Sequence, residues 1–302
     1  MTRDQEAMTV DTSQTMSLAG SEHGVRKPRS AWDRARRNRN LMLGLGLFAL
    51  LVLIAIAAPL LAPFDPFALD YGNTLQPPSL AHLFGTDHLG RDIFSRVLFG
   101  ARIDLRVGII SVISPFIIGM VLGSLAGFYG GWADTYIMRL VDVVQAFPFL
   151  ILVIAIVAVR GPGLQNMYIA VALVAWIVYA RLVRGEILVE KNKEYVHAAR
   201  AIGSTDWRIM RRHLLPNVIT TSVVYAMADI ALYILLAAAL SFLGLGAKPP
   251  TPEWGVMITE GRQYITTAWW ISALPGLAIV LTGIILSLIG DGLADFLRPE
   301  RR

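Results

Sequence analysis

The chain has 302 residues, of which 55% are hydrophobic and 16% are charged, and its net charge is +5. A typical soluble domain carries about 25% charged residues and a disordered chain has low hydrophobicity, so this composition excludes both classes. The sequence contains no cysteine, which excludes a disulfide scaffold, a cysteine nucleophile and a thiolate metal site.

Six apolar stretches are long enough to cross a bilayer, because its hydrocarbon core requires roughly 20 mostly apolar residues per helix. Strands of a membrane barrel would be shorter and would alternate in polarity. The sequence therefore predicts an all-α integral membrane protein with six transmembrane helices. The stretches cover residues 41–62, 107–133, 143–159 (with its start extended toward Tyr136), 161–180, 214–247 and 263–290.

The spans divide the chain into two tails, an external loop and a helical core. We expect the polar N-terminal tail to be largely disordered. We expect the first span to be an uncleaved anchor, because a secretory signal would place its apolar segment much nearer Met1. The predicted segments are the tail 1–40, the first helix 41–62, the external loop 63–103, a five-helix core 104–295 with an internal loop 181–217, and the C-terminal tail 296–302.

Lysine and arginine are concentrated on one side of these spans. If the N-terminal tail is cytoplasmic, 20 of the 27 basic residues lie on the cytoplasmic side. Basic residues favour that side, so the predicted orientation places both termini in the cytoplasm. We expect the basic cluster at 26–39 to enforce this orientation and to contact anionic lipid rather than nucleic acid.

The second span carries Gly119, Gly123 and Gly127 at four-residue spacing, which predicts a seam where another helix packs closely. Pro148 removes a backbone hydrogen bond inside the third span. Such a proline is typical of a kinked helix around a central path, and equally of irregular packing without a function.

The loop between the fourth and fifth spans is predicted to contain two short helices and a sharp bend. Residues 194–202 favour a helix, which Gly203 ends as a glycine at the C′ position does. A basic helix resting on lipid and a rigid knob for a soluble partner are both compatible with this pattern. The small Ala198 and Ala199 favour the knob. The second helix has three suitable N-caps and a basic face: Ser204, Thr205, Asp206, Arg208, Arg211 and Arg212.

This loop resembles the EAA loop of permease subunits of binding-protein-dependent ABC importers. Ala198, Ala199, Gly203 and the Leu215–Pro216 pair match that motif, and His197 stands where it usually has a glutamate.

Two external strings are similar to the dipeptide/oligopeptide/nickel branch of these permeases. One is residues 84–102, which includes Thr86–Asp87 and Gly90–Asp92, and the other is Pro-Pro-Thr-Pro-Glu-Trp-Gly at 249–255. The likeness runs from about residue 32 to 298.

The resemblance implies an ABC type I importer permease fold in a bacterial inner membrane, and import of di- or oligopeptides by alternating access. It also implies a second permease subunit, two ATPase subunits on the cytoplasmic face and an extracytoplasmic substrate-binding protein. The chain lacks a phosphate loop, so we expect no enzyme activity and no cofactor or metal in it; the ATPase subunits would bind ATP and Mg. The residues expected to couple to the ATPase are Glu194, His197, Ala198, Ala199, Gly203, Ser204, Asp206, Arg208 and Arg211.

Other functions compete with peptide import. Import of nickel, a metal chelate or another small solute by the same class is not separated from it by these motifs. A secondary transporter would usually show inverted repeats and paired intramembrane charges, of which the sequence shows only Asp229. A membrane-embedded hydrolase would need a catalytic set, and none is recognisable.

Asp229 is a candidate for the translocation path, because a charge in mid-span is costly and by default functional. It could meet a peptide ammonium group, or it could pair with a partner helix or face a water-filled cavity. Arg139 and Asp142 are three residues apart at a helix start, and we expect them to form a local ion pair.

Asp87, Arg91 and Asp92 lie in the external loop and are candidates for docking the binding protein or for gating. The alternative is an amphipathic helix on the outer membrane surface. His82 and His88 lie nearby, but their spacing matches no standard metal site, so we expect solvated loop residues.

Overall fold

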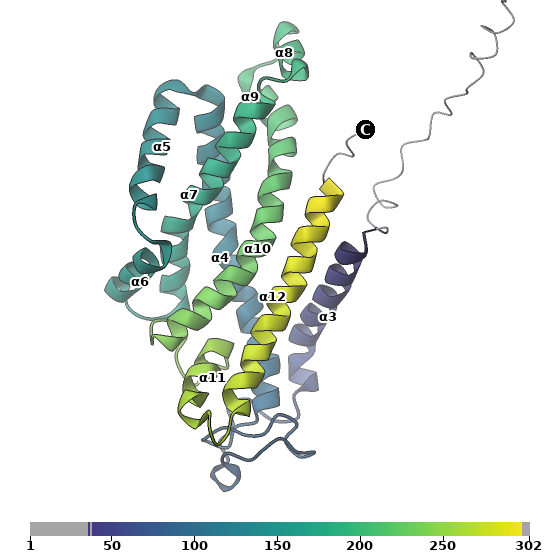
Figure 1. The fold of residues 1–302 in the computed structure, drawn as a ribbon, viewed down its shortest axis with the longest axis vertical. Helices are drawn as coiled ribbons and strands as arrows, with labels where there is room; N and C mark the ends of the chain where they lie inside the picture. The colour runs from purple at the N-terminus through teal and green to yellow at the C-terminus, as the bar shows by residue number, and fades with distance from the viewer. Residues whose placement is uncertain (1–35, 37, 298–302) are drawn as a thin grey trace, which may run out of the picture.

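The computed structural model describes residue 36 and residues 38–297. This part of the chain is a helical bundle (Figure 1), without a β-strand beyond an isolated bridge between Thr86 and Asp92. Its α-helices are α3 (Arg39–Leu61), α4 (Ile93–Tyr129), α5 (Gly131–Gln145), α6 (Phe149–Arg160), α7 (Leu164–Glu190), α8 (Glu194–Ala201), α9 (Asp206–Ile209), α10 (Leu215–Phe242), α11 (Trp254–Gly261) and α12 (Trp270–Leu297).

Five helical stretches in the described residues are long and apolar enough to span a membrane: α3, α4, α7, the continuous stretch α9–α10, and α12. A sixth span arises if α5 and α6 are counted as one broken crossing. Each apolar stretch satisfies its backbone hydrogen bonds within its own helix, as lipid requires. The all-α membrane class predicted from the sequence is therefore confirmed.

The predicted third span, 143–159 with its start extended toward Tyr136, is a broken crossing. α5 ends at Gln145, α6 begins at Phe149, and the two helices are bent by 84°. Proline disfavours helical backbone in the residue that precedes it. Pro148 is the N-cap of α6, so the chain leaves the helical path at Phe147 and turns.

Helix α4 is longer than the predicted second span, which started at 107. It begins at Ile93, where the Asp92 side chain accepts a hydrogen bond from the Ser95 backbone N–H at 2.8 Å. The additional turns carry Arg96 and Asp104, which are fully buried in protein. A hydropathy argument excludes such residues from a span because it cannot see that protein, rather than lipid, surrounds them.

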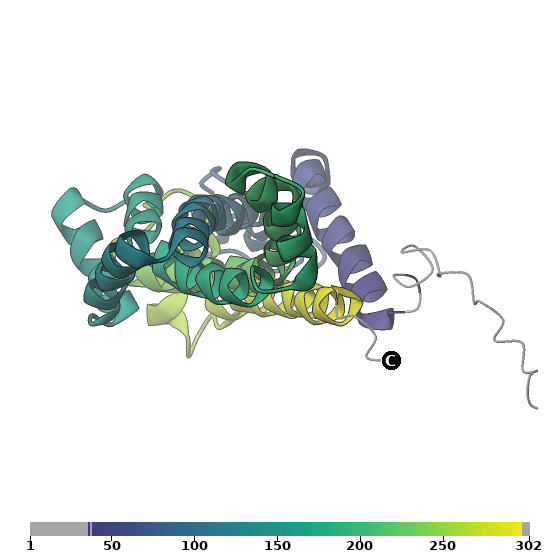
Figure 2. The ribbon, with the colours of Figure 1, turned by 90° about the horizontal axis from the view of Figure 1, so that it is seen from above.

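The two ends of the bundle are built differently. In Figure 1, α8 and α9 lie at the same end as the start of α3 and the end of α12, while the loop 62–92 and α11 lie at the opposite end. Seen from above, α3 lies beside α12 at one edge and α5 and α6 lie at the other (Figure 2). Asn38 Nδ2 donates to the Gly292 carbonyl at 2.9 Å and so fastens the start of α3 to α12.

The three glycines of α4 form the predicted close-packing seam, and their partner is α7. A Cβ on Gly119 would lie 2.3 Å from Tyr179 Cβ, and one on Gly123 would lie 2.4 Å from the Ala180 carbonyl oxygen. Real Cβ atoms do not approach other atoms so closely, so only glycine permits this approach of the two backbones. The seam prediction is confirmed.

Candidate functional site

Helix α8 ends in a glycine cap, as predicted. Gly203 has φ +80°, a left-handed conformation that glycine adopts without steric cost. Its N–H donates to the Arg200 carbonyl at 2.9 Å, and the Ser204 N–H donates to the Ala199 carbonyl at 3.0 Å. This pair of bonds is a Schellman motif, which satisfies the last carbonyls of the helix and turns the chain sharply.

The second helix of this loop is not a separate surface helix, which corrects the sequence-based prediction. Thr205 caps it by accepting from the Arg208 N–H at 3.4 Å. From Asp206 onward the chain continues through a π-helical turn, Met210–Leu214, directly into α10. Pro216 lacks an N–H, and the wider turn, in which the Leu215 N–H donates to the Met210 carbonyl, lets the helix pass it.

The loop is held against the bundle by apolar contacts of its own. Val196, Ala199 and Ile209 are buried in one cluster with Phe128 of α4 and Ile187 of α7. Packing on two long helices makes the loop a rigid extension of the bundle.

The outer surface of this loop is partly apolar. Ile202 is 83% exposed and Trp207 is 67% exposed. Of the predicted coupling residues, Ala199 is buried and Ser204 is half-buried, while the others are exposed: Glu194, His197, Ala198, Gly203, Asp206, Arg208 and Arg211.

Polar contacts connect α8 to its neighbours. The Tyr195 hydroxyl donates to Glu190 Oε2 at 2.6 Å and accepts from Asn217 Nδ2 at 3.3 Å, while Lys193 forms an ion pair with Glu190. Burial, with the Glu190 carboxylate beside it, raises the pKa of Tyr195 above its ordinary value. These contacts join the end of α7, the start of α8 and the start of α10.

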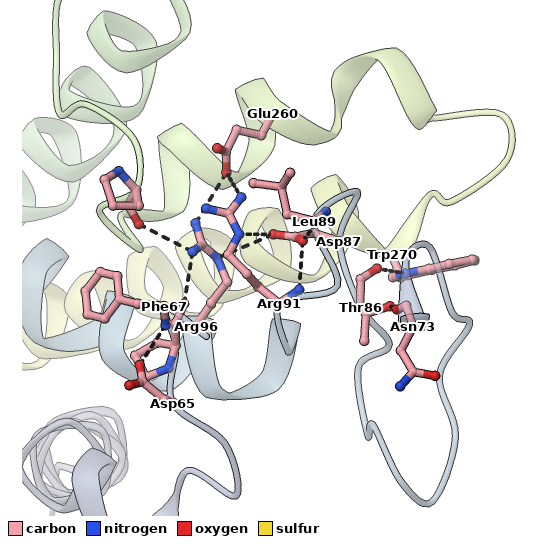
Figure 3. Close-up of polar contacts among 12 residues, drawn as sticks. Asp65, Phe67, Asn73, Thr86, Asp87, Leu89, Arg91, Arg96, Glu260 and Trp270 are labelled. Atoms are coloured by element: carbon pink, nitrogen blue, oxygen red, sulfur yellow. Dashed lines mark hydrogen bonds and ion pairs between the residues drawn. The ribbon is translucent and has the colours of Figure 1, made fainter. Parts of the chain in front are cut away.

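A buried charge network lies at the opposite end of the molecule (Figure 3). Arg91 Nε lies 2.5 Å from Asp87 Oδ2, and Arg91 Nη2 lies 2.9 Å from Glu260 Oε2. Arg96 Nη2 lies 3.3 Å from the same Glu260 oxygen and its Nη1 donates to the Pro66 carbonyl at 3.1 Å. The network therefore connects the loop 62–92, α4 and α11.

Asp87, Arg91 and Asp92 are 1%, 1% and 3% exposed, which contradicts the expectation that they form a docking surface. The alternative, a role in gating, stays a prediction. The predicted solvation of His82 is also wrong. Its Nδ1 lies 3.0 Å from Asp92 Oδ1 and its ring stacks on Phe64. Each charge has an opposite charge or a backbone donor close by, and that is the condition for burying it.

Asp229 lies in α10 and is 5% exposed. Its Oδ2 accepts hydrogen bonds from the Tyr179 hydroxyl at 2.7 Å and from the Tyr233 hydroxyl at 3.3 Å. It also lines a cavity of about 320 Å³ between α7, α10 and the break between α5 and α6. The sequence-predicted path candidate therefore does border an open space.

The predicted local pair of Arg139 and Asp142 does not form. Asp142 Oδ1 instead accepts from Arg181 Nη2 of α7 at 2.7 Å. Helix packing brings α7 alongside α5, so Arg181 of α7 pairs with Asp142 in place of the nearby Arg139.

Two family profiles match the chain. The profile described as binding-protein-dependent transport system inner membrane component matches residues 119–302. The profile of the N-terminal TM domain of oligopeptide transport permease C matches residues 29–78. The chain belongs to the family of binding-protein-dependent transport-system permeases.

Similar permeases cover nearly its whole length. The glutathione transport system permease protein GsiD of Pectobacterium atrosepticum is 47% identical, over 92% of this chain and 93% of that protein. The dipeptide transport system permease protein DppC of Alkalihalophilus pseudofirmus is 43% identical, over 91% and 90%. The di/tripeptide transport system permease protein DppC of Pseudomonas aeruginosa is 44% identical, over 89% and 91%.

The permease fold is also found among solved structures. A chain from a structure of inward-facing conformations of the MetNI methionine ABC transporter matches with a TM-score of 0.53 at 21% sequence identity. The match covers 68% of this permease and 97% of that chain. This confirms the predicted importer permease fold.

Four important residues of this permease were not predicted. Arg96 and Glu260 complete the buried charge network, and Tyr179 and Tyr233 hold Asp229. Two sequence signals were available: Glu260 is the only charge in the α11 segment, and Tyr233 follows Asp229 by one helical turn.

Proposed function

We propose that this permease is a pore subunit of an ATP-driven importer of di- and oligopeptides. The observation that supports the substrate class is its identity of 43–47% with permeases named for glutathione, dipeptides and di/tripeptides, over about nine-tenths of each chain. Glutathione is itself a short peptide, so the three names share one class of substrate.

In this proposal the permease pairs with a second, similar permease in the bacterial inner membrane. Two ATPase subunits bind ATP and Mg on the cytoplasmic face, and an extracytoplasmic binding protein delivers the peptide. The excess of basic residues on one side supports a cytoplasmic location for both termini and for the loop that contains α8. The permease itself carries out no catalytic step.

Residues 194–213 form the coupling element and sit in a groove of one ATPase subunit. Two features support this role. The apolar cluster around Val196 and Ile209 makes the element rigid, so movement of the ATPase is passed to α7 and α10. The exposed Ile202 and Trp207 offer the apolar contacts that a groove requires.

Uptake by the complete complex in proteoliposomes tests the proposal. The permease is co-purified with its partners and supplied with the binding protein and radiolabelled dialanine. We expect accumulation that requires ATP and is reduced by excess unlabelled dipeptide but not by nickel chloride. Uptake of nickel alone, or dipeptide uptake that persists without ATP in an ion gradient, would contradict it.

A further inference from the structure

Asp229 has no part in the coupling element, yet a carboxylate at mid-span is costly and needs a reason. Within residues 38–297 it accepts hydrogen bonds from Tyr179 and Tyr233 and forms no ion pair with a lysine, arginine or histidine. Both hydroxyls bond to Oδ2, so Oδ1 carries no hydrogen bond from a described residue. The carboxyl group is therefore held in place by two hydroxyl groups and has no basic partner among residues 38–297.

The cavity beside Asp229 has an acidic and aromatic wall. Tyr225 and Tyr233 line it together with Asp229, and the Tyr225 ring packs edge-on against Tyr179 with centroids 5.4 Å apart. Phe147, at the break between α5 and α6, also lines it. No basic side chain is among the described residues that line the cavity, and Asp229 supplies the one carboxyl group among them.

A carboxylate surrounded by aromatic rings is the chemistry that recognises an ammonium group. Opposite charge supplies the attraction, and aromatic faces stabilise a cation that has left water. The rest of the cavity is mainly apolar, with residues such as Val174, Ile177 and Leu232, and can accept aliphatic side chains without selecting among them.

We propose that Asp229, held by the Tyr179 hydroxyl and flanked on the cavity wall by Tyr225 and Tyr233, is a binding site for the α-ammonium group of a peptide inside the permease. The identity of the ligand, a peptide, rests on the proposed function. The claim that Asp229 gives the cavity a negative charge does not rest on it. Every unblocked peptide carries this group whatever its sequence, so a site for it suits a path that takes many peptides.

The first test measures the charge of the cavity without transport. The natural chain has no cysteine, so Leu232→Cys places one thiol on the cavity wall, where the leucine is 49% exposed. In the purified complex, modification rates are measured with a cationic trimethylammonium-ethyl and an anionic sulfonatoethyl methanethiosulfonate. We expect Asp229→Asn to lower the cation-to-anion ratio about tenfold, because one unit charge nearby acts oppositely on the two reagents.

Two further variants make this test decisive. Asp229→Glu keeps the charge and should keep the ratio. Leu80→Cys lies in the external loop, is 99% exposed, and should show the same ratio whether Asp229 is present or replaced by asparagine. An unchanged ratio at Leu232→Cys on Asp229→Asn substitution, or an equal fall at Leu80→Cys, would overturn the proposal. Co-purification of the partner subunits shows that each variant is folded.

The second test uses a peptide as a protecting ligand. Dialanine should slow modification of Leu232→Cys when Asp229 is present, while N-acetyl-dialanine should not. Equal protection by the two compounds, or by dialanine in the Asp229→Asn variant, would refute the ammonium site. Absence of ATP-dependent dipeptide uptake in a complex that keeps the charge-dependent labelling would instead refute the proposed function.

Discussion

At the residue scale, the buried charge network shows how paired charges hold the loop 62–92 of this membrane protein in place. Arg91 and Arg96 are 1% and 0% exposed and share the Glu260 carboxylate, which lies 169 residues from Arg91 in sequence. Burying these charges is favourable only while they are paired. The network therefore makes the loop conformation depend on α11.

Removing one member of the network should strongly destabilise the end of the bundle that holds the loop 62–92 and α11. Arg91→Met removes the cation that lies 2.5 Å from Asp87 Oδ2 and leaves only Arg96 Nε, 4.0 Å away, as its ion-pair partner. Breaking a buried pair in this way costs about 3–5 kcal/mol. Thermal unfolding of the purified complex, followed by tryptophan fluorescence, should show a lower midpoint than for Arg102→Met. Arg102 is exposed, so it is the matched control. Equal midpoints for the two variants would contradict the assigned role.

At the element scale, the loop after α7 consists of helix α8, a glycine turn at Gly203, and helix α9, which continues through a π-turn into α10. The Gly203 turn reverses the chain, and the π-turn at Met210–Leu214 carries it into α10 without a break. The apolar cluster of the loop packs on α4, α7 and α10, so the loop is part of the same packed body.

The backbone of Gly203, rather than its small volume, should be the property that matters in this chain. A Cβ there would meet no atom within 4 Å, but φ is +80°. A β-branched residue is costly in this conformation, by about 1–2 kcal/mol, whereas asparagine tolerates it better. We expect Gly203→Val to lower dipeptide uptake per ATP hydrolysed, with Gly203→Asn falling less. Equal coupling in both variants and the parent, at equal protein levels, would exclude this requirement.

At the scale of the whole molecule, the sequence predicted the features that are set by residues close together in the chain. The membrane class follows from apolar runs of about 20 residues, the glycine seam of α4 from a four-residue spacing, and the end of α8 from a single glycine. The pairings of Asp142 with Arg181 and of Arg91 with Glu260 do not, because they arise only when distant helices pack. Pro148 indicated a possible kink in the third span, but hydropathy alone does not distinguish a continuous span from the 84° break between α5 and α6.

The predicted orientation can be tested with two single cysteines in this cysteine-free chain. Trp207→Cys lies at the α9 end and Leu80→Cys in the loop at the opposite end. In intact cells, a membrane-impermeant maleimide should label Leu80→Cys and should reach Trp207→Cys only after permeabilisation. The reverse pattern would invert the topology. Loss of Trp207→Cys labelling when the ATPase subunits are co-expressed would support the coupling role.

The uninterrupted rod formed by α9, the π-turn and α10 has a geometric consequence. Asp229 and Trp207 belong to the same helical stretch, Asp206–Phe242. An α-helix advances 1.5 Å and turns about 100° per residue, and the π-turn at Met210–Leu214 departs from this twist. The number of residues and the π-turn together set the direction of the Asp229 side chain relative to the exposed Trp207 indole. A rotation of this helix about its axis at Trp207 would therefore change the direction in which the Asp229 carboxyl group faces the cavity.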